Sequence, residues 1–580
     1  MKDYPLQIST EPKGNFMETE FQVVVELCEK LEATSKRTLM VSLVADFLRR
    51  LEADEVEPAV SMLLGRAFPK WDQRTLEVSW RTLSGVIKRI TDVKWSKFSE
   101  AFGKTGDVGA ATKIVFESGK IRKQAALFEE PLTILEVRRS LEAIAEATGH
   151  GSRERKERLL ETLLGRATSL DAKYIVKIMI GEMRTGFHEG LMELAVSKAF
   201  NVSHETVQRA SMLTGDTGEV AGIAKIEGGE GLSRLQFQLF RPIKPMLAQT
   251  ADDVNEVLEE HGGETAFEQK LDGARIQIHK CGNDVRIYSR RLTDVTESFP
   301  EIVRLSRDEV GARKVIVEGE VIALGEDGRP LPFQHLMRRF RRARNIEEMV
   351  KLIPVELYLF DLPYLDGQSL TTHSYAERRE TLEEIAGSIS LTKQLVTSDA
   401  QEAERFLDDA IAEGHEGLMA KKLDSPYTPG IRGKRWFKIK KTLEPLDLVI
   451  VAAEWGYGRR HNWLSDYHLA AKNAETGELL MVGKTFKGLT DEEFIEMTKR
   501  LKELSITEEH GKVVVAPKIV IEVAYNEIQK SPKYKCGMAL RFARITRIRD
   551  DLGSEDADTI QRVREIYEKQ FEKKARYSNF

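Results

Sequence analysis

The sequence predicts a multidomain protein: an all-helical region, then a mixed α/β region, then a β-rich region that forms a small barrel. In the first two hundred residues apolar side chains recur at three- and four-residue spacing, which is the period of an amphipathic helix. The clearest such segments are Thr38 to Leu51, Leu132 to Ala147 and Ala172 to Met183. Beyond Gly228-Gly229 strands and helices alternate, and from near Pro445 short β-branched runs dominate.

Length and composition bound the class of protein. At 580 residues the chain is long enough for several domains of about 150 residues each. Its 41% hydrophobic and 31% charged content is that of a soluble globular protein. No apolar run approaches the ~18 residues of a membrane span, and Met1 to Pro5 begin no signal peptide, so we expect a cytoplasmic protein. Three widely separated cysteines (Cys28, Cys281 and Cys536) argue against a disulfide framework and a zinc site.

Prolines, glycines and short apolar runs indicate where the regions begin and end. Arg241 to Ala248 contains two prolines and is expected to be an extended linker. In the last region three runs read as strands: Leu448 to Ala453, Val513 to Val515 and Ile519 to Val523. Gly483-Lys484-Thr485 suggests a phosphate-binding loop, but that motif needs a glycine five residues earlier, where Glu478 stands. A strand end and turn is the better interpretation there.

The most informative stretch runs from Glu268 to Arg275. Alternating apolar and polar residues predict a strand, a tight turn at Asp272-Gly273 and a second strand. Lys270 then lies at a strand end, where it is either an ordinary turn residue or a nucleophile. A lysine attacks phosphorus when burial or neighbouring cations lower its pKa and leave it neutral.

The order of further motifs along the chain favours Lys270 as a nucleophile over an ordinary turn residue. Lys270-Leu271-Asp272-Gly273-Ala274-Arg275 resembles motif I of the covalent nucleotidyltransferases, which include ATP-dependent DNA ligases, RNA ligases and capping enzymes. The remaining motifs follow in the family's order: Ser289 to Arg291, Glu318 to Glu320, Tyr358 to Asp361, Glu416 to Lys421, Trp436 to Lys440, and Arg541 to Arg549. The chain therefore most resembles the ATP-dependent DNA ligases of the archaeal and eukaryotic replicative type.

The resemblance implies a set of ATP contacts around Lys270 as the catalytic nucleophile. Glu268 is implied as the acceptor for the adenine amino group, and Phe360 as the ring that stacks on the base. Arg275, Arg290 and Glu320 correspond to ribose and phosphate contacts, and Arg432 to a further nucleotide contact. Lys438 and Lys440 flank Ile439 and would share one strand face. They correspond to α-phosphate contacts, and as cations they would also lower the pKa of Lys270.

The same resemblance implies Mg²⁺, a hard ion that prefers carboxylate and water oxygens. Glu320 and Glu416 occupy the metal-contacting positions, although relatives often have aspartate where this motif begins with Glu318. Arg541, Arg544 and Arg547 recur every three residues and are implied as clamps on the pyrophosphate of ATP. Leu552 follows Asp551 where many relatives have lysine, which puts in doubt any role that depends on that lysine.

Nicked duplex DNA is the implied partner. A net charge of −5 does not by itself indicate a protein that binds nucleic acid, but basic residues cluster at Arg338 to Arg344 and Lys434 to Lys441. Gly181 to Gly186 resembles a phosphate-contacting loop of the ligase DNA-binding domain. Three residues (Gln124, Leu127 and Phe128) form a short sliding-clamp-like motif, with an ordinary loop as the alternative.

Together these expectations define a monomeric, nucleoid-associated enzyme. We expect a helical DNA-binding domain over 1–230, an adenylation domain over 231–442 and an OB-fold domain over 443–580. The alternatives are an RNA ligase or capping guanylyltransferase that uses the same lysine, and a non-catalytic DNA-binding scaffold. The large helical region argues against the first pair. The intact set Lys270, Glu320, Lys438 and Lys440 argues against the scaffold.

Overall fold

Helix-capping residues and apolar periodicity determine the first part of the fold. A computed structural model of the chain describes residues 18–119, 130–325, 328–331, 333–340, 346–430, 432–440, 443–509 and 511–571. The chain divides into two compact units, Met1–Gln236 and Phe237–Phe580, and each is described by itself. None of the helices in these ranges combines the length and apolar character that crossing a bilayer requires.

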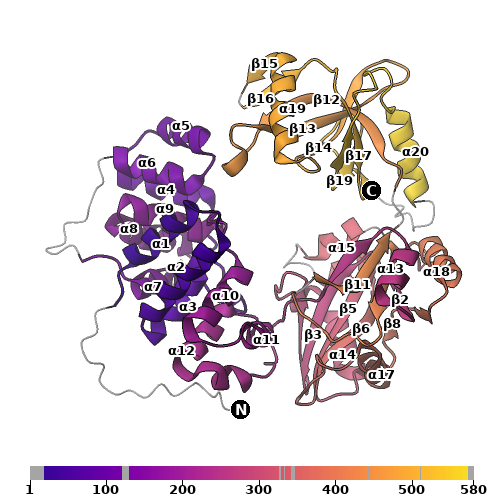
Figure 1. Cartoon of the computed structure of the whole chain (residues 1–580), viewed down its shortest axis with the longest axis horizontal. Helices are drawn as coiled ribbons and strands as arrows, with labels where there is room; N and C mark the ends of the chain where they lie inside the picture. Colours follow the sequence, from indigo (N-terminus) through magenta and orange to yellow (C-terminus); the bar gives the residue numbers. More distant parts are fainter. Residues whose placement is uncertain are drawn as a thin grey trace. The chain divides into compact units, whose positions relative to one another are not determined.

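The first unit is helical throughout its described residues (Figure 1). Its helices are α1 Phe21–Glu32, α2 Arg37–Arg50, α3 Ala53–Leu63, α4 Trp80–Thr91, α5 Trp95–Thr105, α6 Val108–Ser118, α7 Ile134–Glu146, α8 Ser152–Arg166, α9 Ser169–Ile180, α10 Glu189–Phe200, α11 His204–Thr214 and α12 Thr217–Ser233. The three segments predicted as helices are confirmed as α2, α7 and α9. Helix α9 ends three residues early because Gly181 adopts a left-handed φ of +74°.

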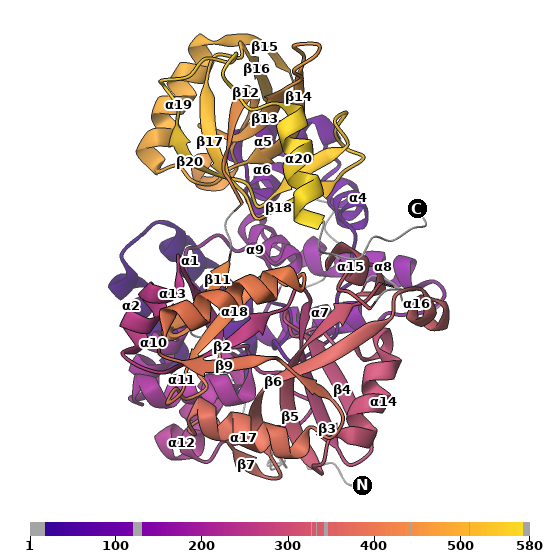
Figure 2. The ribbon, with the colours of Figure 1, turned by 90° about the vertical axis from the view of Figure 1, so that its right-hand side faces the viewer.

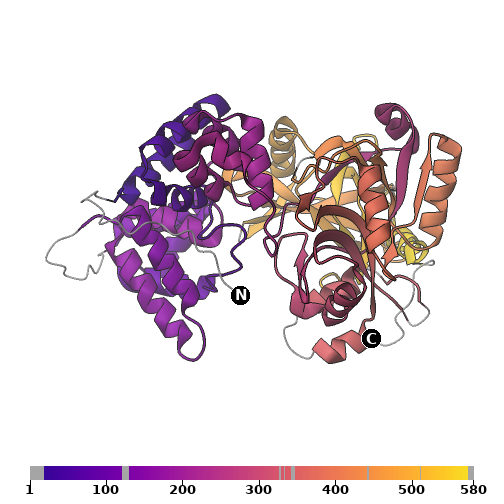
Figure 3. The same ribbon diagram turned by 90° about the horizontal axis from the view of Figure 1, so that it is seen from below.

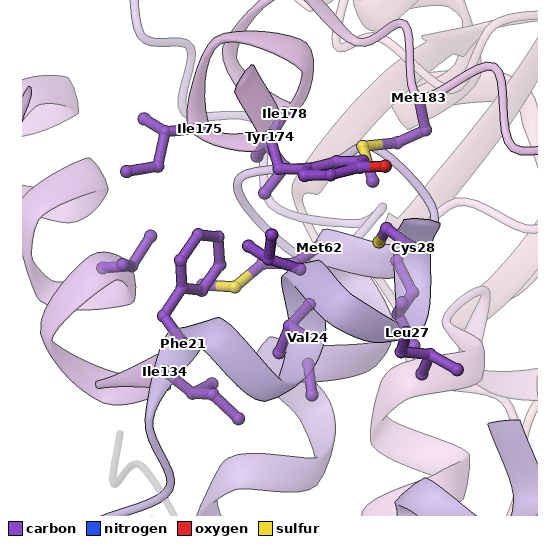
Figure 4. Close-up of a cluster of buried hydrophobic side chains, with 14 of the residues drawn as sticks. Phe21, Val24, Leu27, Cys28, Met62, Ile134, Tyr174, Ile175, Ile178 and Met183 are labelled. Carbon is purple, nitrogen blue, oxygen red and sulfur yellow. The ribbon is translucent and has the colours of Figure 1, made fainter. Parts of the chain in front are cut away.

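Capping and core packing hold these helices together. Thr133 and Thr168 each begin a helix with a capping box, in which their hydroxyls accept from the backbone three residues on. Figure 4 shows side chains from four helices meeting in one cluster. Its labelled members include Phe21 of α1, Met62 of α3, Ile134 of α7 and Tyr174 of α9, all of them buried. Helix α12 continues past the glycine run through a kink at Gly228. Figure 3 shows the same helices from below.

The second unit opens with two sheets and the helices that cover them (Figure 2). One sheet has the order β4-β3-β5-β6-β7, with β8 beside β6, and the other has the order β1-β11-β10-β2-β9. The strands are β1 Leu247–Ala251, β2 Thr265–Lys270, β3 Ala274–Cys281, β4 Asp284–Ser289, β5 Lys314–Ala323, β6 Val355–Leu365, β7 Gln368–Ser369, β8 Ser390–Leu391, β9 Gln394–Thr397, β10 Gly417–Lys422 and β11 Arg432–Lys440. The predicted strand–turn–strand around Asp272-Gly273 is confirmed as β2 and β3.

Each sheet buries one face under helices. The helices of this region are α13 Val254–His261, α14 Pro300–Glu309, α15 Phe333–Phe340, α16 Ile346–Leu352, α17 Tyr375–Ile385 and α18 Ala400–Ala412, with η1 Thr296–Ser298. Phe267, Leu418 and Phe437 of the second sheet pack with Val257 of α13 in one apolar cluster. Because side chains alternate along a strand, the opposite face of β2, β10 and β11 carries Lys270, Gly417 and Lys440.

The proline-containing segment Arg241 to Ala248 is not helical, as its prolines predict, and its last two residues already belong to β1. Hydrogen bonds attach this segment and the preceding Phe240 to the first sheet. The Phe240 amide donates to Nδ1 of His279 at 2.9 Å, and the Ile243 amide donates to Oε1 of Gln277 at 2.8 Å. Tyr288 also donates to the Phe240 carbonyl at 2.7 Å. Burial lowers the pKa of His279 to about 3, so the ring is neutral and can accept the amide proton.

The last region is rich in sheet. Its strands are β12 Leu446–Trp455, β13 Leu464–Lys472, β14 Leu479–Thr485, β15 Ser505–Glu509, β16 Lys512–Val515, β17 Val520–Ala524, β18 Glu527–Lys530, β19 Met538–Arg541 and β20 Arg544–Ile548, with η2 Gly458–Arg460, α19 Asp491–Glu503 and α20 Ile560–Phe571. The first two predicted runs fall within β12 and β16, and the third overlaps β17, which begins one residue later than predicted. Gly483-Lys484-Thr485 ends β14 and is therefore no phosphate loop, as expected.

Candidate active site

Strand register brings the candidate nucleophile and its neighbours together. Gly417 of β10 pairs with Lys270 of β2 on one side and with Lys440 of β11 on the other. Two residues along, Met419 pairs with Glu268 and with Lys438. The backbone amide of Glu416 also donates to the Lys270 carbonyl at 2.8 Å. The sheet therefore places the side chains of motifs I, IV and V on one face.

Two glycines permit this close approach. A Cβ on Gly273 would lie 2.4 Å from the Val321 carbonyl oxygen of β5, so the turn after Lys270 requires glycine. Gly417 has a φ of +142°, and a Cβ there would lie 2.2 Å from the Ile439 carbonyl oxygen. The glycines of the Asp-Gly and Glu-Gly pairs are thus geometric requirements of the site.

Lys270 is paired with a carboxylate. Its Nζ lies 2.5 Å from Glu416 Oε2, and Lys440 contacts the same oxygen. Burial disfavours the charged lysine, but the Glu416 and Glu320 carboxylates outweigh burial and raise the pKa of Lys270 above its ordinary value. The expectation that the Lys270 pKa lies below its ordinary value is therefore wrong, because the carboxylates outweigh burial.

The neighbouring Lys438 has the opposite shift, to a lower pKa. Burial lowers the pKa of Lys438, and the charges of Lys440, Arg432, Lys270 and Arg290 lower it further. Arg290 and Arg432 are exposed, yet they lie close enough to Lys438 to influence its charge. The charges of both predicted arginines thus act on Lys438.

Two carboxylates stand beside Lys270. Burial raises the pKa of Glu320 to about 7, against the opposing charges of Lys270 and Arg275. Burial also acts on Glu416, but Lys270 and Lys440 lower the pKa of that carboxyl. Among the described residues, no group of three or more His, Cys, Asp and Glu side chains is arranged as a metal cage. Two carboxylates nevertheless fit Mg²⁺, which usually keeps water and phosphate oxygens among its ligands.

Arg275 is held rigidly from several sides. It donates to Glu318 at 2.6 Å and to the Met246 carbonyl at 2.8 Å, while Tyr427 donates to the same Glu318 oxygen at 2.6 Å. Glu318 is only 1% exposed. The first glutamate of motif III is therefore an anchor for Arg275.

Glu268 lies in a buried polar network. Tyr375 and Lys421 donate to its Oε1, and Thr392 donates to its Oε2 at 2.9 Å. Phe360 is 8% exposed and lies beside Arg275, whose guanidinium carbon is 5.2 Å from the ring centroid. The sequence identified Glu268 and Phe360 but missed Tyr375 and Thr392, which belong to no motif. The sequence offered one signal of this network. Lys421 lies two residues from Met419 and so shares its strand face, and Met419 pairs with Glu268.

The motif VI arginines lie in the last region on two different strands. Arg541 ends β19 and pairs with Glu527 at 3.1 Å, while Arg544 and Arg547 belong to β20 and are exposed. Phe542 breaks the run with a φ of +55°. The three-residue spacing therefore does not form a stripe on one element. Leu552 packs against the small cluster of Val449, Val520 and Ala557, an apolar setting that does not suit lysine.

The glycine loop of the helical unit connects α9 and α10. Arg184 has a φ of +54° and Gly186 a φ of +73°, so the loop turns sharply. Nζ of Lys177 donates to the Met183 carbonyl at 3.0 Å, and Arg184 donates to the Gly106 carbonyl at 2.6 Å. The middle of the loop is thus tied to α9 and to the residue that follows α5. The clamp-like residues Gln124, Leu127 and Phe128 lie outside the described residues.

Taken together, the fold and the site are those of a nucleotidyltransferase, with Lys270 at the end of β2 beside the Glu416 and Glu320 carboxylates. Family models match the chain in three places: "DNA ligase N terminus" over residues 20–197, "ATP dependent DNA ligase domain" over 245–440, and "ATP dependent DNA ligase C terminal region" over 460–552. The chain belongs to the ATP-dependent DNA ligases, and its relatives are of the archaeal type.

Two archaeal relatives illustrate the similarity. A DNA ligase of Thermococcus fumicolans is 48% identical over 544 residues, covering 93% of this chain and 97% of the relative. DNA ligase 1 of Korarchaeum cryptofilum is 49% identical over 554 residues, covering 95% and 98%. A solved structure titled Pmar-Lig_PreS3 aligns with a TM-score of 0.56 at 16% identity over 91% of this chain and 99% of that one, which supports the fold alone.

Proposed function

We propose that this enzyme seals nicks between a 5′-phosphate and a 3′-hydroxyl in duplex DNA, through a lysyl–AMP intermediate on Lys270. Nζ of Lys270 attacks the α-phosphorus of ATP, a P–N bond forms, and the P–O bond to pyrophosphate breaks. The 5′-phosphate oxygen of the nick then attacks the same phosphorus and releases the lysine. Finally, the 3′-hydroxyl attacks the activated 5′-phosphate and AMP leaves. Replication, repair and recombination all require this reaction.

The observation that carries the proposal is the arrangement around Lys270. Its Nζ contacts Glu416, and Lys440 lies on the same carboxylate. Lys438 and Lys440 stand where negative charge develops on the α-phosphate, and fixed cations stabilise such charge in phosphoryl transfer. Phe360 would stack on the base, while Arg275, Arg290 and Arg432 would contact the ribose and phosphates.

Lys270 has to lose its proton before it attacks. In the structure Glu416 and Glu320 favour the charged lysine. Both glutamates are proposed Mg²⁺ ligands, and the ion when bound neutralises carboxylate and phosphate charge. Glu320 and Glu416 would hold the ion, Glu416 would then pair less strongly with the ammonium, and the Lys270 proton would pass to solvent water before the attack. The pairing of Lys270 with Glu416 thus holds the nucleophile in place until ATP and the ion arrive.

The other regions supply DNA contacts in this proposal. The loop from Gly181 to Gly186 would present backbone amides to phosphates. We further propose a DNA-binding domain over 1–230, an adenylation domain over 231–442 and a closed OB-fold over 443–580. Arg541, Arg544 and Arg547 would contact pyrophosphate. The enzyme would act as a monomer at the nucleoid, where its substrate lies, with Gln124, Leu127 and Phe128 as a docking site for a sliding clamp.

A sealing assay tests the proposal. Wild-type protein with ATP and Mg²⁺ should join a 5′-labelled nick in duplex DNA, and Lys270→Ala should abolish joining. A matched duplex with RNA strands should be joined far more slowly. Joining by Lys270→Ala would refute the covalent route, and preference for the RNA duplex would favour an RNA ligase.

A further inference from the structure

Lys421 is a fully buried cation in an aromatic enclosure. Its side chain is 1% exposed, and its Nζ lies 4.9, 4.7 and 4.6 Å from the ring centroids of Phe360, Tyr375 and Trp436. Nζ also donates to the Phe360 carbonyl at 3.0 Å and lies 2.8 Å from Oε2 of Glu268. A buried ammonium needs such an ion pair, because burial of an unpaired charge is very costly.

The Glu268 carboxylate has little spare capacity. Tyr375 and Lys421 donate to Oε1, while Thr392 donates to Oε2 and Lys421 lies near the same oxygen. A carboxylate has about four lone-pair positions. The two hydroxyl donors can rotate away, and Tyr375 already accepts a hydrogen bond from Gln394 at 2.8 Å. Two cations with donors only remain beside the carboxylate: Arg379 at 3.8 Å from Oε1, and Lys421 within 2.9 Å of both oxygens. Lys421 is the nearer of the two and therefore the main partner that fixes Glu268.

This pair lies beside the proposed base position. Glu268 and Lys270 are two residues apart on β2 and share a face, which separates them by about 7 Å along the strand. Lys421 lies across the sheet on β10, and Phe360 borders its ammonium. A nucleotide joined to Lys270 would therefore extend its base towards Glu268 and Lys421. This inference rests on the proposed function.

We propose that Glu268 and Lys421 act as one base-selecting pair, in which Lys421 is a positioning residue whose donors are withheld from the nucleotide. The 6-position of adenine carries an amino donor, which suits a carboxylate. The 6-position of guanine carries a keto acceptor, which would suit an ammonium. With the pair intact, Lys421 donates to Glu268 and to the Phe360 carbonyl, so guanine meets a carboxylate instead. Without Glu268, the same lysine would accept guanine.

The experiment measures kcat/KM for lysyl–nucleotide formation with ATP and with GTP, in the absence of DNA. The proteins are wild type, Glu268→Met, Lys421→Met and the double variant. Methionine keeps the side-chain length, and replacing both partners of a buried pair by apolar groups is often well tolerated. The double variant therefore keeps the test meaningful if a single variant folds poorly. Lys422→Met is the matched control, because Lys422 points to the other strand face and its side chain is 37% exposed.

In Glu268→Met the ATP-to-GTP ratio should fall by about tenfold or more, because a group that hydrogen-bonds the base is exchanged for one of opposite preference. The double variant should recover part of that loss, since the freed ammonium is gone. Lys421→Met should lower the rate with ATP while adenine stays preferred, and Lys422→Met should change neither rate nor ratio. A purely structural role predicts equal losses for both nucleotides and an unchanged ratio, which would overturn the inference.

Failure of the proposed function is distinguishable from failure of the pair. If wild-type protein forms no adduct with ATP, the proposed function and the role of the Glu268–Lys421 pair are both refuted. If the wild type forms the adduct but Glu268→Met and the double variant share one ratio, only the role of Lys421 is refuted.

Discussion

Replacing Gly417 by alanine tests whether activity depends on the geometry of this site, because the variant keeps every charged residue of the site but disturbs the strand pairing that positions them. A Cβ at Gly417 would lie 2.2 Å from the Ile439 carbonyl oxygen and 3.1 Å from Cα of Lys440. Its φ of +142° is also poorly accessible to alanine. Backbone strain of about 1–3 kcal/mol and overpacking of about 1–3 kcal/mol together give a loss of roughly 2–6 kcal/mol. Any relaxation moves β10 away from β11, which separates Glu416 from Lys440 and changes its position relative to Lys270 on β2.

The assay combines urea denaturation with the rate of lysyl–AMP formation under conditions where the variant is folded. Because an error of about 1 Å in a reacting geometry can cost about a hundredfold in rate, we expect a decrease of that order. Gly433→Ala is the matched control, since Gly433 lies on neighbouring β11 and a Cβ there meets nothing within 4 Å. It should change stability by no more than about 0.5 kcal/mol. Equal stability and rate for the two variants would refute the reasoning.

Three further predictions concern charge and docking. Burial raises the pKa of Glu320 in the folded protein to about 7. Its contribution to stability is therefore full below its unfolded pKa and is lost as pH rises through about 7. In metal-free buffer the free energy of unfolding of Glu320→Gln should exceed that of wild type at about pH 8, by at most about 3 kcal/mol, and should match it near pH 4. Because Glu416 and Glu320 raise the Lys270 pKa, the rate of lysyl–AMP formation should climb between about pH 6 and about pH 9 in a rapid-quench experiment, whereas a flat profile would show that the lysine is already neutral. Replacing both Leu127 and Phe128 by alanine should abolish pull-down by a sliding clamp and leave nick sealing intact; undiminished pull-down would remove clamp docking from the account.

Local sequence pattern was sufficient for the parts of the site that lie on single strands. Alternation around Asp272-Gly273 predicted β2, the turn and β3, because a strand with one buried face has a period of two. The same period placed Lys438 and Lys440 on one face. These features depend on neighbours in sequence, and the structure confirms them.

Features that depend on tertiary packing were not predictable in this way. The sequence suggested that cations surround Lys270, but Glu416 approaches it through the pairing of β2 with β10, which lie about 150 residues apart in the chain. The enclosure of Lys421 involves Tyr375, which no motif contains. The arginines of motif VI look periodic in sequence, but Phe542 divides them between two strands. Strand pairing and positive φ at a non-glycine residue leave little trace in one sequence.

The central claim is that Lys270 becomes covalently attached to AMP and passes it to nicked DNA. The most direct test is the intact mass of the purified protein after incubation with ATP and Mg²⁺, once any bound AMP has been removed with pyrophosphate. The account predicts a single AMP adduct that is absent from Lys270→Ala and disappears when nicked DNA is added. No adduct on the wild type, or an equal adduct on Lys270→Ala, would contradict it.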